Sequence, residues 1–78
     1  LPMDLQAIES DLREALGPCE IEIDSEGNKV AVQVVSDAFD GLSRVKRQQL
    51  VYKALNERIA SGEIHAVSMR TLTPAESG

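Results

Sequence analysis

FDGLSRVKRQQLVY, residues 39–52, decides the fold, because it combines a turn, the start of a helix and a cluster of positive charge. Asp40 followed by Gly41 is a typical turn pair. The hydroxyl of Ser43 can accept hydrogen bonds from the backbone N–H groups two and three residues further on, which is the usual arrangement at a helix N-cap. This stretch therefore predicts that a helix begins just after Ser43.

Apolar residues continue the helical pattern beyond this stretch. They recur at spacings of three to five residues, as in a helix that buries one stripe: Leu50 or Val51, Ala54, Leu55 and Ile59. Gly62 is placed to end the helix, because a residue without Cβ adopts positive φ readily. Five of the eight basic residues of the chain lie on this helix: Arg44, Lys46, Arg47, Lys53 and Arg58.

Other elements are predicted on both sides of this helix. Residues 4–16 have helical apolar spacing, and Gly17 with Pro18 ends that helix. Residues 19–24 and 30–35 alternate as two strands joined by a four-residue connection at residues 25–28, and Ile64 to Thr71 forms a third strand. Thr73-Pro74-Ala75-Glu76 has the form of a capping box and predicts the start of one more helix.

The order of these elements predicts an α+β fold. Two strands joined by a short turn must be antiparallel, whereas strands joined through a helix should be parallel with a right-handed crossover. We therefore expect a three-stranded mixed sheet in chain order with both long helices on one face. We predict that residues 1–78 form one domain, with about 3–76 ordered and the ends frayed.

The composition of the chain excludes or disfavours several classes of function. Aromatic residues make up only 3% of the chain, which argues against a protein that stacks nucleic-acid bases. The net charge is −5, and eight of the thirteen acidic residues lie within residues 4–26, so tight generic DNA binding is disfavoured. A single cysteine and the lack of a long apolar run predict a cytoplasmic protein without a membrane partner. We also expect a monomer or a weak homodimer when the protein is alone.

Residues 35–52 and 64–76 resemble the BolA family over two long, correctly spaced segments. The resemblance implies a BolA-like αββαβ(α) fold similar to a class II KH domain. It also implies a monothiol glutaredoxin partner and a [2Fe–2S] cluster held only in the complex, with a role in iron handling and stress response. Some members of the family are described as transcription regulators, which makes DNA a second possible partner, bound through the central helix.

The resemblance also suggests site residues. His65 matches the family histidine that ligates the cluster, and imidazole can replace thiolate in a [2Fe–2S] centre. The second family ligand is a His or Cys in the hairpin loop, where this chain has Lys29, a poor iron ligand when protonated. Cys19 is an alternative thiolate, although it lies at the other end of the first strand and is better explained as a small buried hydrophobe.

The basic helix allows two interpretations. As a nucleic-acid surface it would use Arg44, Lys46, Arg47 and Lys53 on phosphates; otherwise these residues form a solvated face or meet an acidic partner. The chain lacks the Gly-x-x-Gly loop with which KH domains clamp nucleotides. It also lacks a nucleophile motif or a phosphate-binding glycine loop, so we predict that it is not an enzyme.

Overall fold

The computed structural model describes residues 3–78, and the expectation of a frayed N-terminus at residues 1–2 lies outside this range. The elements follow the predicted order: α1 (Leu5–Leu16), β1 (Cys19–Glu26), β2 (Lys29–Ser36), the 3-10 turn η1 (Asp37–Phe39), α2 (Arg44–Ala60), β3 (Ala66–Leu72) and α3 (Pro74–Ser77). The two expected helix starts are confirmed, since Ser43 and Thr73 are the N-caps of α2 and α3.

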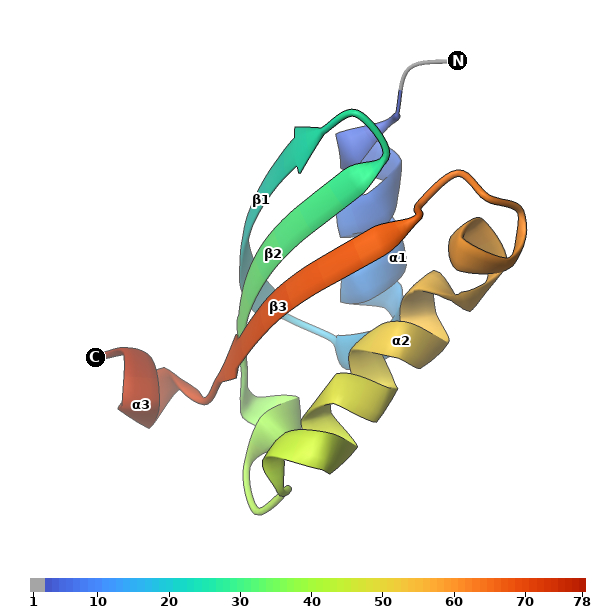
Figure 1. Cartoon of the computed structure of the whole chain (residues 1–78). Coiled ribbons are helices and arrows are strands. Elements are labelled where there is room, and N and C mark those ends of the chain that lie inside the picture. The colour runs from blue at the N-terminus through green and yellow to red at the C-terminus, as the bar shows by residue number, and fades with distance from the viewer. Residues whose placement is uncertain (1–2) are drawn as a thin grey trace.

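The sheet has the predicted topology. Its strand order is β1-β2-β3, with β1 antiparallel to β2 and β2 parallel to β3. Helices α1 and α2 pack side by side on one face, as Figure 1 shows. The α+β fold with a mixed sheet is therefore confirmed.

The core lies between the sheet and these two helices. Each helix buries one stripe of apolar residues, as its periodicity predicts. The buried cluster is formed by Ile8, Leu12, Leu16, Val30, Val32, Val34, Phe39, Val51, Leu55 and Ile64. None of the helices within residues 3–78 is both long and apolar enough to span a membrane.

The β1–β2 hairpin is tighter than its sequence predicts. The predicted four-residue connection is wrong, because Ser25 and Glu26 continue β1 and pair with Val30 and Lys29. Only residues 27 and 28 form the turn. Gly27, the first residue of the turn, has a φ of 61°. The second, Asn28, does not have positive φ, like every other non-glycine residue among residues 3–78. This is the pattern of a type II′ turn with glycine first.

Strand β3 begins two residues later than predicted and ends one residue later. Ile64 does not join the ladder because its N–H donates to the carbonyl of Arg58 at 3.2 Å, which closes the end of α2. Gly62 has a φ of 85° and reverses the chain after the helix, as expected. The chain therefore reverses its direction sharply between α2 and β3.

The short helix α3 is fixed by an arginine of α2. Both hydrogen bonds of the predicted capping box are present between Thr73 and Glu76. The guanidinium of Arg47 donates to Glu76 Oε1 at 2.7 Å, to the Leu42 carbonyl at 3.0 Å and to the Thr71 carbonyl at 3.4 Å. Because charge-assisted bonds to a carboxylate are among the strongest in proteins, this arginine links α3 to the first turn of α2.

We expect this contact to be lost in acid. The Arg47 guanidinium and the Thr73 backbone N–H lower the pKa of Glu76 from 4.5 to about 2. A carboxyl group whose pKa is lowered on folding stabilises the folded state above its unfolded pKa, and this stabilisation disappears as the pH falls toward the folded pKa. The wild-type protein should therefore be more stable than Glu76→Gln at neutral pH, and the difference should vanish between about pH 4.5 and pH 2. Urea unfolding at several pH values measures it, and a pH-independent difference would contradict the assignment.

The outer face of the sheet carries an acidic edge. Along β1, the side chains that point away from the helices belong to Glu20, Glu22, Asp24 and Glu26. All four are exposed. β1 is an edge strand, so these carboxylates border an unpaired backbone edge.

Candidate functional site

His65 lies where three segments meet at one end of the sheet. It is exposed and immediately precedes β3. Its N–H donates to the carbonyl of Asn28 in the β1–β2 turn at 2.8 Å. A Cβ built on Gly62 would lie 3.8 Å from His65 Nε2, so the imidazole is close to the α2–β3 connection. The backbone at His65 is therefore fixed while its ring remains accessible from outside.

The hairpin position at which the resemblance implies a second ligand lies beside this histidine. Lys29 pairs in register with Ala66, the residue directly after His65, and Lys29 is exposed. The structure thus brings together two positions that are 36 residues apart in the sequence. Figure 1 shows the β1–β2 turn and the α2–β3 connection at the same end of the molecule.

A hollow of about 710 Å³ opens at this end of the molecule. Its walls come from the start of α1, the β1–β2 turn and the α2–β3 connection, through Met3, Asp4, Gly27, Asn28, Ser61, Gly62 and Glu63. Two of these residues are neighbours of His65. The Asn28 carbonyl accepts a hydrogen bond from its backbone N–H, and Gly62 lies close to its ring. His65 does not line the hollow, which lies next to these two neighbours of the histidine.

Cys19 is not part of this site. It is the first residue of β1 and pairs with Ser36, the last residue of β2, so β1 separates it from the turn. Seven residue steps at about 3.3 Å each place it roughly 23 Å from Glu26. Burial raises the pKa of the Cys19 thiol, with Arg13 opposing and Glu9 adding to this effect. The half-buried thiol packs against the core and is disfavoured as a thiolate ligand.

The donor set suits a shared cluster rather than one held by this chain alone. Within residues 3–78, no group of three or more His, Cys, Asp or Glu side chains is placed to hold a metal ion. His65 offers one accessible nitrogen, and a [2Fe–2S] centre with a histidine ligand is chemically established. At this end of the molecule the chain therefore offers one imidazole nitrogen that fits such a centre.

Arg47 has a structural role that its sequence context does not reveal. Its side chain is only 14% exposed and is bonded to Glu76 and to two carbonyls. A guanidinium used in this way is not free to meet a phosphate. We therefore leave Arg47 out of the candidate nucleic-acid surface.

The other three basic candidates are exposed but do not form one patch. None of the ion pairs among residues 3–78 includes Arg44, Lys46 or Lys53. Lys46 and Lys53 are seven residues apart and share a face of α2, while Arg44 points roughly 200° away from Lys46. Each of the two lysines follows an exposed apolar residue, Val45 at 61% and Tyr52 at 45%.

The sequence did not indicate the roles of two residues near His65. Asn28 contributes its backbone carbonyl, which no side-chain motif can indicate. Arg58 bonds Asp11 at 2.7 Å and Glu63 at 2.8 Å, and the first of these partners is 47 residues away in the sequence. Only the fold could show that Arg58 differs from the exposed cations of the same helix.

Comparison with known proteins agrees with this architecture. Residues 8–76 match the BolA family, described as BolA-like protein. The chain is 46% identical over 74 residues to the acid stress protein IbaG of Escherichia coli K12, covering 95% of this chain and 88% of that protein. It is 38% identical over 80 residues to BolA-like protein 1 of Bos taurus, covering 90% of this chain and 58% of the bovine protein.

Solved structures show the same fold. BolA1 from Arabidopsis thaliana superimposes with a TM-score of 0.86 over 100% of both chains at 30% identity. The BolA domain of SufE1 from the same plant gives a TM-score of 0.86 at 34% identity, over 97% of this chain and 98% of that one. With the family match covering nearly the whole sequence, the chain belongs to the BolA family.

Proposed function

We propose that this protein binds a monothiol glutaredoxin and contributes His65 as one ligand of a [2Fe–2S] cluster that the two proteins share. The observation that carries the proposal is the setting of His65, an exposed imidazole on a backbone fixed by the 2.8 Å bond to the Asn28 carbonyl. A ligand held in this way needs little reordering when a partner arrives.

Two further observations support this role. The hollow beside His65 leaves room for a projecting group of the partner. The name of the E. coli relative, an acid stress protein, supports a function in stress response. The proposed role is not enzymatic, and it places the protein in the cytoplasm with its partner.

The residues at the site indicate which cluster ligands this chain supplies and which its partner supplies. The cluster, when bound, supplies the redox and iron chemistry, and the task of this chain is to present one nitrogen to it. Protonated Lys29 has no lone pair to donate, so it cannot take the part of the family's loop ligand. The partner side must then provide the remaining ligands, and we expect a labile shared cluster.

The test mixes the protein with a monothiol glutaredoxin that carries its cluster, and records visible absorption and circular dichroism. We expect a spectrum distinct from that of the glutaredoxin alone, and its loss in His65→Ala. Because His65 is exposed, the variant should keep its fold, with an unfolding free energy within about 0.5 kcal/mol of the wild type. Calorimetry on the same samples reports binding independently of the cluster.

The possible outcomes separate three roles. A changed spectrum that is identical in His65→Ala would refute ligation by this residue. Binding by calorimetry without any spectral change would indicate an adaptor that docks the glutaredoxin without sharing its cluster. The absence of binding would refute the partnership and favour the second candidate function.

That second candidate is a DNA-binding transcription regulator that uses α2. The exposed Lys46 and Lys53 on one helix face favour it, whereas the net charge of −5 and the internal bonds of Arg47 count against it. The hypothesis requires an affinity that falls steeply with salt, with a smaller slope in Lys46→Ala. It also requires tighter binding to a specific promoter fragment than to random DNA.

A further inference from the structure

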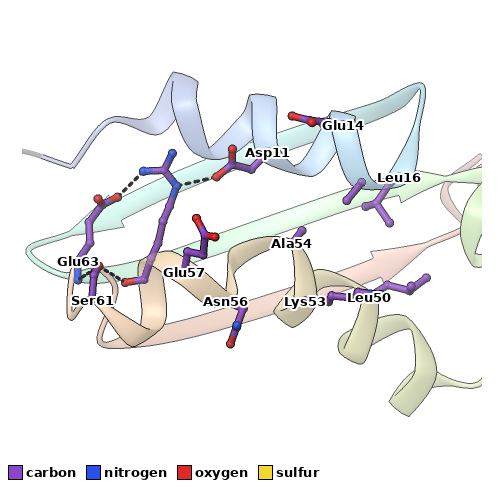
Figure 2. A pocket seen from close by; sticks show the side chains of 12 residues that line it. Asp11, Glu14, Leu16, Leu50, Lys53, Ala54, Asn56, Glu57, Ser61 and Glu63 are labelled. Atoms are coloured by element: carbon purple, nitrogen blue, oxygen red, sulfur yellow. Dashed lines mark hydrogen bonds and ion pairs between the residues drawn. The ribbon is translucent and has the colours of Figure 1, made fainter.

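Arg58 spans the groove between α1 and α2. Its Nε donates to Asp11 Oδ2 on α1 at 2.7 Å, and a terminal nitrogen donates to Glu63 Oε2 at 2.8 Å. Figure 2 shows these two bonds as dashed lines that end on Asp11 and Glu63. The Arg58 side chain is 24% exposed, so both bonds are partly shielded from water. One guanidinium thus ties the α2–β3 connection to α1.

The backbone of Arg58 holds the same connection. Its carbonyl accepts hydrogen bonds from the hydroxyl of Ser61 at 3.0 Å and from the N–H of Ile64 at 3.2 Å. The Ser61 hydroxyl in turn accepts from the N–H of Glu63 at 3.3 Å. Both the guanidinium and the backbone carbonyl of Arg58 therefore hold residues 61–64. These residues lead directly into His65.

Packing supports His65 only through the residue that precedes it. The residue before it, Ile64, is 1% exposed and anchors the chain in the core, but His65 itself is exposed. Its position thus depends on the path of residues 61–64 and on the bond to the Asn28 carbonyl. A change in that path would move the imidazole relative to the β1–β2 turn.

We propose that Arg58 is a positioning residue for His65, acting through Glu63 to hold the α2–β3 connection in the path that presents the imidazole beside the turn. The importance of this for a cluster rests on the proposed function, whereas the positioning itself is a property of the protein alone. Asp11 fixes the other side of the guanidinium and serves as a bridge to α1.

The chain offers a matched pair of variants for the test. Asp11 and Glu63 bond the same guanidinium at nearly equal distances, and their side chains are 35% and 37% exposed. Each alanine substitution removes one ion pair of Arg58, but only Glu63→Ala removes a bond between Arg58 and the α2–β3 connection. A general loss of stability should therefore be similar in the two variants, and a positional effect should appear in Glu63→Ala alone.

The first readout is hydrogen exchange of the His65 amide, measured by NMR on the protein without a partner. We expect exchange roughly fivefold or more faster in Glu63→Ala than in Asp11→Ala, because local opening of the connection exposes the bond to Asn28. Equal exchange in the two variants would overturn the proposal. The comparison needs no cluster, so it remains informative if the glutaredoxin partnership fails.

The second readout is the visible circular dichroism of the complex with cluster-loaded glutaredoxin. We expect a weaker or shorter-lived signal with Glu63→Ala and an unchanged one with Asp11→Ala. Faster amide exchange with an unchanged spectrum would overturn the claim that positioning matters for ligation. If the wild-type complex gives no distinct spectrum, the proposed function fails, and the exchange result alone decides the positioning role.

Discussion

Replacing Phe39 with alanine is expected to lower the free energy of unfolding by about 3–5 kcal/mol, the usual cost of removing a buried phenylalanine ring. Phe39 is fully buried in η1, between the end of β2 and the start of α2, and it is the largest fully buried side chain in the described chain. A domain of 78 residues has a total stability of roughly 4–12 kcal/mol. The variant would therefore lose a large part of its stability.

Urea unfolding followed by far-UV circular dichroism measures this loss. Tyr52→Ala is the matched control, because Tyr52 is the other aromatic residue of the chain and is 45% exposed. We expect the control to lose no more than about 1 kcal/mol. Equal losses in the two variants would mean that the core is not organised around Phe39 as the structure indicates.

The second large effect is expected from Lys29→Cys, which should lengthen the lifetime of the shared cluster. The substitution places a thiolate donor on the residue that pairs with Ala66, next to His65. Even outer-shell partners change metal affinity 10- to 100-fold, so a new ligand should lengthen the lifetime by roughly tenfold or more. This prediction rests on the proposed cluster.

The lifetime is read from the decay of visible absorption after a chelator is added to the complex. Lys29→Ala is the control, because it removes the ammonium group without supplying a donor. If the cysteine and alanine variants decay at the same rate, the side chain at this position does not reach the cluster. If His65→Ala abolishes the gain of Lys29→Cys, the two residues act on the same cluster.

Much of the fold could be predicted because local signals agree with the tertiary arrangement. The turn at Gly41, the N-cap at Ser43 and the glycine at 62 each act over a few residues, and all three are confirmed. Strand order and direction followed from the length of the connections. The hairpin length was wrong because Ser25 and Glu26 are polar and exposed, so they have the composition of a turn although they are paired.

The candidate site could be predicted less well from local sequence signals. The resemblance directed attention to His65 and Lys29, but only the register places their segments side by side. The roles of Arg47 and Arg58 depend on carboxylates 29 and 47 residues away, Glu76 and Asp11. On the sequence alone, all the cations of α2 look alike, and packing decides which remain exposed.

The carboxylates along β1 affect whether two copies of the protein can associate through this strand. An unpaired strand edge is a template for pairing with another chain, and natural sheets often block it with charge. If two copies joined through β1, the rows formed by Glu20, Glu22, Asp24 and Glu26 would face one another across the new junction. Repulsion between these rows protects the protein against growth of the sheet from chain to chain, and so against aggregation by β1 pairing.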